Sequence, residues 1–347
     1  ETLKACKIFR KLQPLNISIE KQFSIIPKIK GEYHSFPTVV KEGNQLLMAV
    51  RSAKVDVDQP HGREGEVRLY HSTVDAPEAW QQVPLEFVNN GEWELDAILS
   101  SAGGQLRLVS RHFRHEVYND CFLSNFKLED LAKDKLLLEK MPIQIEEMNL
   151  AAIYGHLQQA ADGALLLPLY GLLPGSGQIT SPGLYHSYDQ GKSWSLRSIL
   201  VDSGQVGKYL NELSMVQLAE GEWLGLVRDN HDPCNMCQLR SVDDGYSWEL
   251  KESGLYGHAP MLCKTPMGVV AIYRDVGRLE ASVSIAHFDR GLDQWSHLGV
   301  VRSYSGNRYN GGYGDVVSLG ANRIFVLYYL SDEDESPWVE GAVVELQ

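Results

Sequence analysis

Hydrophobic and polar positions alternate along most of this 347-residue chain, and the alternation breaks at Gly, Asn or Asp. Six segments share one order: a polar residue, a hydrophobic stretch, a turn, a second hydrophobic stretch, and then Arg or Tyr. Period-two alternation on both sides of a turn predicts an antiparallel hairpin. The six segments span residues 34–51, 96–111, 154–171, 212–228, 258–274 and 313–329.

The hairpins recur at a nearly regular spacing, because their last residues differ by 60, 60, 57, 46 and 55 positions. A repeat of this length, built from small antiparallel sheets, is typical of a β-propeller. We therefore predict an all-β fold, a six-bladed β-propeller of four-stranded antiparallel blades, with residues 1–347 forming a single domain.

The remaining strands of each blade are expected between the hairpins. Strand-like stretches lie at residues 66–71, 121–126, 183–186, 238–241 and 281–288. The last one, at 338–346, is expected to pair with residues 16–29, which would close the ring and leave no open sheet edge. Only residues 128–138 suggest a short helix.

A second motif recurs beside these stretches. Residues 187–194 read S-Y-D-Q-G-K-S-W and residues 241–248 read S-V-D-D-G-Y-S-W, with weaker copies at 73–80 and 287–295. In such a turn the Asp accepts backbone N–H groups, Gly supplies a positive φ, and Trp packs the hairpin against its blade. We expect the motif to stabilise the fold rather than to take part in catalysis.

Charge and composition exclude several classes of partner. The net charge is −13 and Lys and Arg are not clustered, which argues against nucleic-acid binding. No run of 18 apolar residues is present, so we expect no membrane insertion. Five cysteines favour a reducing compartment, the cytoplasm, with a periplasmic or secreted location as the alternative. Cys234 and Cys237 have the spacing of metal ligands but no second pair, so we expect no metal and no cofactor.

The hairpins place polar side chains at equivalent positions. The innermost strands of a propeller begin near its axis, so the residues that open the repeats should face a central funnel. These residues are His34, Asp96, Tyr154 or His156, Glu212, His258 and Tyr313. Four repeats end in arginine, at Arg51, Arg111, Arg228 and Arg274. Since the guanidinium fork suits carboxylates and sulfates, the pattern predicts a cradle for such an anionic group, of the kind that an acidic glycan carries.

The octapeptide motif, S-x-D-x-G-x-[ST]-W, resembles the Asp box (BNR repeat) of the sialidase superfamily, whose fold is a six-bladed propeller. The resemblance extends over essentially the whole chain. It implies an exo-acting, retaining glycosidase of the sialidase (neuraminidase) type that releases a terminal acidic sugar.

The resemblance also implies catalytic roles. In sialidases a Glu in an N-E segment activates a Tyr nucleophile, and an Arg follows that Glu by one hairpin. Glu212 and Arg228 match this pair, Arg274 matches the next family arginine, and Tyr313 matches the nucleophile. The acid/base Asp falls in the loop after the first hairpin, where spacing favours Asp58 over Asp56.

One position departs from the family pattern. The first family arginine belongs to an F/Y-R-I-P element, and this chain has Tyr33-His34-Ser35-Phe36-Pro37 there. A clamp of three arginines on a carboxylate cannot be built from the matched positions alone. The expected substrate is therefore a sialic acid or another ulosonic acid.

Two alternatives remain open at the level of the sequence. In a polysaccharide lyase, Tyr313 with His34, His156 or His258 would remove the proton beside a uronate carboxylate neutralised by Arg228 and Arg274. The other alternative is a propeller that binds glycans without converting them.

Overall fold

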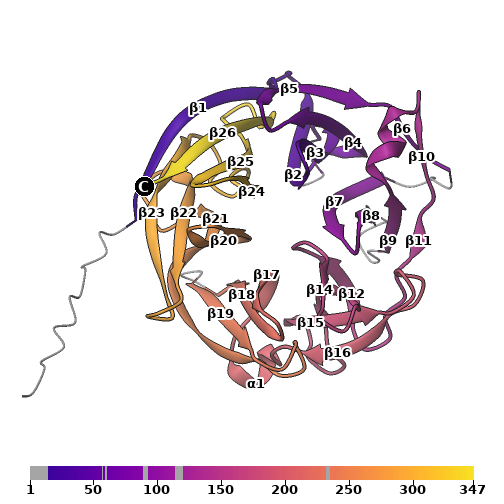
Figure 1. Cartoon of the computed structure of the whole chain (residues 1–347), viewed down its shortest axis with the longest axis vertical. Helices are drawn as coiled ribbons and strands as arrows, with labels where there is room; N and C mark the ends of the chain where they lie inside the picture. The colour runs from indigo at the N-terminus through magenta and orange to yellow at the C-terminus, as the bar shows by residue number, and fades with distance from the viewer. Residues whose placement is uncertain (1–14, 57, 59–60, 89–92, 114–119, 232–234) are drawn as a thin grey trace, which may run out of the picture.

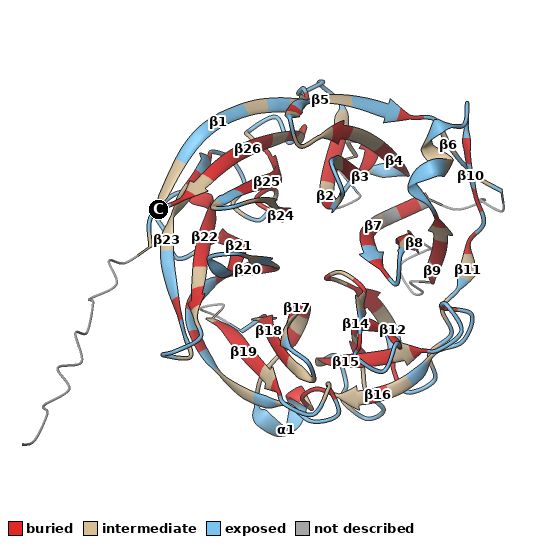
Figure 2. Ribbon diagram, viewed as in Figure 1, coloured by how far each residue is buried: buried red, intermediate tan, exposed pale blue. Residues whose placement is uncertain are grey.

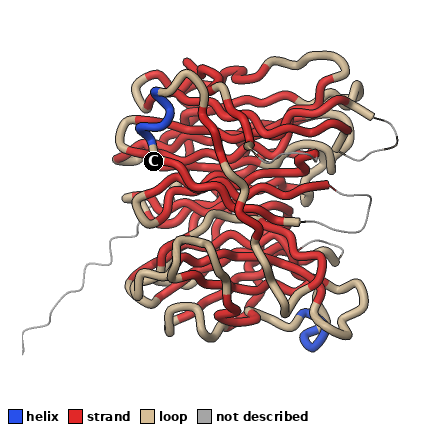
Figure 3. The backbone as a smooth tube through the Cα atoms, turned by 90° about the vertical axis from the view of Figure 1, so that its right-hand side faces the viewer, coloured by secondary structure: helices blue, strands red, loops and turns tan. Residues whose placement is uncertain are grey.

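The computed structural model describes residues 15–56, 58, 61–88, 93–113, 120–231 and 235–347. Within these ranges, regular structure is almost entirely β-strand, with one short α-helix, α1 (Ser203–Val206), and one 3-10 helix (Leu128–Ala132). Figure 1 shows the sheets arranged as sectors around a central opening. Seen from the side, strands fill the body of the molecule and the two helices lie at its periphery (Figure 3). None of the described helices is long and apolar enough to cross a membrane.

Four of the sheets are consecutive along the chain, apart from one strand supplied by the N-terminal segment. The first contains β2 (Glu32–Glu42), β3 (Gln45–Lys54), β4 (Arg63–Thr73) and β5 (Ala76–Val83). The second contains β7 (Trp93–Ala102), β8 (Gln105–Phe113), β9 (Cys121–Phe126) and β11 (Met141–Pro142). The third contains β12 (Asn149–Ile153), β13 (Gln158–Gln159), β14 (Leu165–Leu172), β15 (Thr180–Ser187) and β16 (Ser195–Ile199). The last contains β24 (Gly314–Gly320), β25 (Arg323–Leu330), β26 (Trp338–Leu346) and β1 (Ile17–Ile26).

The remaining large sheet has seven strands: β17 (Leu210–Ala219), β18 (Glu222–Asp229), β19 (Asn235–Ser241), β20 (Glu249–Thr265), β21 (Gly268–Asp275), β22 (Ala281–Asp289) and β23 (Gln294–Tyr304). The first half of β20 pairs with β19, and its second half, from Gly257 onward, pairs with β21. One long strand therefore joins two four-stranded sets. A separate parallel pair, β6 (Leu85–Phe87) and β10 (Leu136–Leu138), lies outside the second sheet.

The two ends of the described chain meet in one sheet. Strand β1 runs antiparallel to β26, from the pair Ile17–Leu346 to the pair Ile26–Val339. This confirms the predicted pairing of residues 338–346 with the N-terminal segment. The helix expected over residues 128–138 is only partly present, because the 3-10 helix ends at Ala132 and residues 136–138 form β10.

The hydrophobic core lies between neighbouring sheets. Leu47 and Leu69 of the first sheet, together with Leu99 and Leu108 of the second, belong to one buried cluster. Figure 2 shows the buried residues concentrated within the sheets and the exposed ones along the outer strands, such as β1. Burial of each such side chain contributes about 1.5–3 kcal/mol to folding, so the packing of sheet on sheet stabilises the ring.

The recurrent turn motif has the predicted geometry. Asp189 accepts hydrogen bonds from the backbone N–H and the hydroxyl of Ser193, at 2.9 and 2.6 Å. Asp243 makes the same two bonds with Ser247. The turn also reaches the preceding sheet, because Trp248 Nε1 donates to Ser198 Oγ at 3.2 Å.

Replacing Gly191 by Ala tests this packing. Gly191 has φ +89°, which favours glycine, and an added Cβ would overlap the Cδ2 atom of Leu123 in the neighbouring sheet. We expect G191A to lower the free energy of unfolding by about 2 kcal/mol, measured by urea denaturation. The exposed Gly163, also at positive φ but with open space around its Cα, is the matched control, and G163A should cost clearly less. Equal losses in both variants would contradict the packing argument.

Candidate active site

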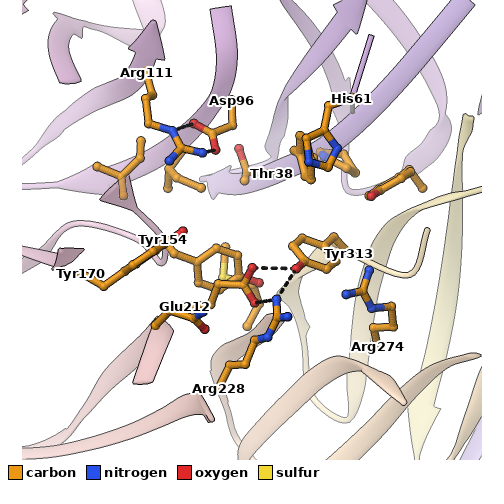
Figure 4. A pocket seen from close by; sticks show the side chains of 18 of the residues that line it. Thr38, His61, Asp96, Arg111, Tyr154, Tyr170, Glu212, Arg228, Arg274 and Tyr313 are labelled. Atoms are coloured by element: carbon orange, nitrogen blue, oxygen red, sulfur yellow. Dashed lines mark hydrogen bonds and ion pairs between the residues drawn. The ribbon is translucent and has the colours of Figure 1, made fainter. Parts of the chain in front are cut away.

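A cavity of about 470 Å³ opens at one end of the central opening. Residues on or beside the inner strands line it, with one contribution from nearly every sheet (Figure 4). These contributions are Thr38 of β2, Asp96 of β7, Tyr154 after β12, Glu212 of β17, Met261 of β20 and Tyr313 before β24. Segments far apart in sequence therefore meet here, as the repeat predicted.

Three side chains form a hydrogen-bonded group on the wall of the cavity. The Tyr313 hydroxyl donates to Glu212 Oε1 at 2.6 Å. Arg228 Nη1 donates to the Tyr313 oxygen at 2.9 Å and to Glu212 Oε2 at 3.0 Å. The backbone N–H of Ala259 also donates to Glu212 Oε2, at 3.1 Å. The carboxylate is thus held in one orientation, with Oε1 directed at the phenol.

Tyr313 is enclosed by aromatic rings. Phe36, Tyr154 and Tyr329 contact it edge-on, with ring centroids 5.7, 6.3 and 6.3 Å away. Burial and the Glu212 carboxylate raise the pKa of Tyr313, although the guanidiniums of Arg274 and Arg228 act in the opposite direction. The hydroxyl is therefore protonated in the free protein, and its proton lies on the line to Glu212.

Arg274 covers the other face of this group. Its guanidinium lies 4.5 Å from the centroid of the Tyr313 ring. It donates to the carbonyl oxygens of Tyr309 and Gly311, at 2.7 and 3.2 Å, and lies 2.6 Å from His258 Nδ1. Burial, together with the Arg228 and Arg274 charges, lowers the pKa of His258 to about 2, so this imidazole is neutral.

Arg111 and Asp96 form a separate pair on the opposite side of the cavity (Figure 4). Arg111 Nε and Nη2 donate to the two oxygens of Asp96, at 3.1 and 2.6 Å. Together with Arg228, Arg274 and Glu212, this pair gives the cavity lining three guanidiniums and two carboxylates. The excess positive charge favours an anionic ligand.

The structure brings most of the predicted site residues together in the cavity. Those that line it are Tyr313, Glu212, Arg228, Arg274, Asp96 and Arg111. The expectation that every residue opening a repeat would face the funnel is wrong for His34 and His258. Both are buried and neither lines the cavity. The pairing of β2 with β3 shifts register between Ser35 and Thr38, and that of β20 with β21 shifts between His258 and Met261. Each histidine precedes such a shift, so it does not share the face of the strand that lines the cavity.

His156 and Arg51 also lie outside the cavity, for different reasons. His156 lies deeper in the central opening, where its ring contacts Asp315 and the Leu99 carbonyl. Arg51 is 2% exposed and donates to backbone carbonyls of Glu94, His61 and Gly62. Its position at the end of a hairpin suggested a ligand contact, but the structure shows it binding a loop.

Asp58 is exposed on the loop between β3 and β4 and does not line the cavity. Its backbone N–H donates to Asp56 Oδ1 at 2.9 Å.

Three residues that line the cavity, His61, Tyr170 and Tyr309, were not predicted from the sequence. Tyr170 is the last residue but one of the third hairpin, so the repeat register could have indicated it, whereas His61 and Tyr309 lie in loops without a repeated pattern. Cys234 of the Cys234–Cys237 pair lies outside the described residues.

Comparisons with known proteins identify the fold. No protein-family profile and no curated protein sequence matches the chain. A crystal structure of a protein of unknown function from Dyadobacter fermentans is similar over 96% of this chain and 100% of its own, with a TM-score of 0.79 and 17% identity. Penicillium chrysogenum α-L-arabinanase, complexed with arabinobiose, gives a TM-score of 0.69 at 14% identity, over 94% of this chain and 98% of that one.

Trypanosoma rangeli sialidase in complex with sialic acid gives a TM-score of 0.66 at 13% identity, over 96% of this chain. The match spans 59% of the length of that sialidase. The chain therefore has the β-propeller fold found in sialidases and in an arabinanase, which is a fold of glycoside hydrolases.

Proposed function

We propose that residues 1–347 form a single six-bladed propeller domain, and that it is an exo-acting glycosidase of the sialidase type. It would release a terminal acidic sugar, a sialic acid or another ulosonic acid, with retention of configuration. The similarity of fold to sialidases and to an arabinanase supports glycoside hydrolysis in general. The side chains of the cavity support the more specific proposal.

The observation that carries the proposal is the 2.6 Å hydrogen bond from the Tyr313 hydroxyl to Glu212. The anomeric carbon of an ulosonic acid bears a carboxylate, which would repel a charged nucleophile. A neutral phenol avoids that repulsion until Glu212 accepts its proton during attack. Arg228, which contacts both partners, stabilises the negative charge as it moves from the carboxylate to the phenol oxygen.

The guanidiniums supply the specificity for an acid. Arg228 and Arg274 flank Tyr313, and both line the cavity. Two guanidiniums beside the nucleophile suit the carboxylate of the substrate. His34 and Ser35 occupy the position where sialidases carry their first arginine. Both are buried, so they cannot add a third contact to the substrate carboxylate beside Arg228 and Arg274.

A lyase has less support from the geometry, because the histidines named for it, His34, His156 and His258, do not line the cavity. The decisive experiment incubates the protein with synthetic glycosides of sialic acid, other ulosonic acids, uronic acids and arabinose. Release of a reducing acidic sugar, first as the retained anomer by NMR, supports the proposal. An unsaturated product that absorbs in the ultraviolet would indicate a lyase, and a thermal shift without turnover would indicate binding alone.

Replacing Glu212 by Gln tests the base. We expect E212Q to lower kcat by about 100-fold or more, since an amide cannot accept the proton of Tyr313. The measurement is the rate of sugar release under saturating substrate. The exposed Glu66 of β4 provides the matched control, and E66Q should retain the wild-type rate. Wild-type activity in E212Q would contradict the role of Glu212.

A further inference from the structure

The proposed hydrolysis needs a group that gives a proton to the glycosidic oxygen, and the carboxylates that line the cavity are already engaged. Glu212 accepts hydrogen bonds from Tyr313, Arg228 and Ala259. Asp96 is held as a carboxylate by both nitrogens of the Arg111 fork. Neither is suited to donate a proton to a leaving group. Asp58, the candidate from the sequence, is exposed and does not line the cavity.

His61 is the remaining group with an ordinary pKa near neutrality among the described residues that line this cavity. Figure 4 shows it facing the same space as Tyr313. Its backbone has φ +75°, in the left-handed region, where Asn, Asp and His are the common non-glycine residues. Strained backbone of this kind is maintained where the surroundings enforce it, often at functional sites.

The surroundings that enforce it are visible. Arg51 donates to the His61 carbonyl and, at 3.3 Å, to that of Gly62, while its Nε donates to the Glu94 carbonyl of β7 at 2.8 Å. One buried guanidinium thus ties the loop that bears His61 to the neighbouring sheet. This explains why a hairpin-end arginine is retained in the interior without contacting the cavity.

The hydrogen bonds around His61 also favour one of its tautomers. The Tyr33 hydroxyl donates to Asn310 Oδ1 at 2.6 Å, and it lies 3.4 Å from His61 Nδ1. Because its single proton is used on Asn310, the hydroxyl presents a lone pair to the histidine. Nδ1 therefore carries a hydrogen, and Nε2 is the nitrogen free to gain and lose a proton.

His61 and the proposed nucleophile line the same cavity and share a neighbour. The Phe36 ring contacts both the His61 ring and the Tyr313 ring, with centroid distances of 5.1 and 5.7 Å. The two rings are therefore separated by no more than the sum of these distances. A sugar bound with its anomeric carbon against Tyr313 Oη would lie in the cavity that both side chains line.

We propose that His61 is the general acid and base of the reaction, in place of Asp58; this rests on the proposed function. In the first step Tyr313 Oη bonds to the anomeric carbon and its proton passes to Glu212. The bond to the leaving oxygen breaks, and that oxygen takes the proton of His61 Nε2. In the second step His61 Nε2 takes a proton from water as the water oxygen bonds to the anomeric carbon. In the same step the bond from the anomeric carbon to Tyr313 Oη breaks, and the phenol oxygen recovers its proton from Glu212.

The charges that face His61 set the pH range. Its withdrawal from bulk water inside the funnel and the guanidiniums of Arg51, Arg111 and Arg274 lower its pKa to about 4, while Glu212 acts in the opposite direction. The cationic form that donates the proton is therefore populated on the acid side. We expect kcat/KM, which reports the free protein, to fall as pH rises through the range above this pKa. The fall in kcat, which reports the complex, should lie at higher pH, because the carboxylate of the bound sugar favours the cation.

The test compares leaving groups in H61N, chosen because asparagine tolerates positive φ. For an acidic sugar linked to a poor leaving group, such as methanol or another sugar, we expect kcat/KM to fall by about 100-fold or more. For the 4-nitrophenyl glycoside, whose leaving group needs no proton, the loss should stay below about tenfold. H287N, which changes a histidine on β22 outside the cavity, is the matched control.

Two outcomes would overturn the assignment. One is equal loss on both substrates in H61N; the other is the selective loss on poor leaving groups appearing in D58N instead. A second measurement is independent of turnover: ¹⁵N NMR of the histidine rings should show hydrogen on Nδ1 of His61, assigned by its absence in H61N. A neutral ring with hydrogen on Nε2 contradicts the inference. The wild-type protein could release no acidic sugar and still show hydrogen on Nδ1 of His61. That result would contradict the proposed function but not the hydrogen bonding described for His61.

Discussion

Replacement of Tyr313 by Phe is expected to abolish sugar release, with kcat reduced by at least about 10³-fold and substrate affinity largely retained. The variant lacks the oxygen that would bond to the anomeric carbon, but it keeps the ring that contacts Phe36, Tyr154 and Tyr329. Losses of this size are typical when a nucleophile is removed and the rest of the site still binds. Turnover is measured by release of the acidic sugar, and binding by calorimetry with the same glycoside.

Tyr328 provides the control for this variant. It is a buried tyrosine on β25 that does not line the cavity, so Y328F should keep nearly wild-type kcat. Residual activity of Y313F within tenfold of wild type would exclude a tyrosyl intermediate. Loss of binding together with turnover would show that Tyr313 positions the sugar rather than reacting with it.

The second large effect is expected on stability, at a buried ion pair in the central opening. Asp315 is fully buried and accepts hydrogen bonds from the N–H groups of Val39 and Val316, both at 2.7 Å. His156 Nε2 lies 3.0 Å from the carboxylate, and its Nδ1 lies 2.7 Å from the Leu99 carbonyl. The pair thus connects strands β2, β7 and β24 with the break between β12 and β13.

Replacing Asp315 by Asn should lower the free energy of unfolding by about 3–5 kcal/mol, the usual cost of breaking a buried ion pair on one side. Burial lowers the pKa of His156, but Asp315 and the Leu99 carbonyl outweigh it and the net shift is upward. A histidine whose pKa is raised by folding contributes its full stability below the unfolded value of about 6.5 and loses it as pH rises through the folded value. The deficit of D315N should therefore be largest at acidic pH and shrink as pH rises.

Urea unfolding of both proteins over a pH series measures this difference. E129Q, which removes an exposed ion pair between Glu129 and Lys127, is the control and should change stability by less than about 1 kcal/mol at any pH. A deficit in D315N that does not vary with pH would mean that His156 stays neutral in the folded protein.

The repeat in the sequence predicted which segments meet, but not which way every side chain points. Asp96, Glu212 and Tyr313 line the cavity as expected, whereas His34 and His258 do not. The inner strands carry β-bulges near their openings, and each extra residue reverses the inward and outward faces of the residues before it. Phe36 and Ala259, within two of these bulges, have positive φ values of 52° and 54°.

The sequence also did not predict which loop residues reach the cavity. His61 reaches the cavity because Arg51 binds its carbonyl and Tyr33 contacts its ring, and these contacts join residues from two strands and a loop. Neither spacing nor composition marks a histidine for such a position. Asp58, three residues earlier, fits a family pattern better but lies outside the cavity.

The amino-acid sequence alone indicated the all-β class of fold and the pairing of the chain ends, whereas its resemblance to sialidases pointed to the Tyr313–Glu212–Arg228 group. Alternation and turn residues act locally, and repetition multiplies the signal. The tertiary structure decided which arginines bind backbone and which face the cavity, and it placed His156 against the buried Asp315. Those outcomes depend on bulges and on contacts between sheets, where a shift of one residue changes the partner of every side chain.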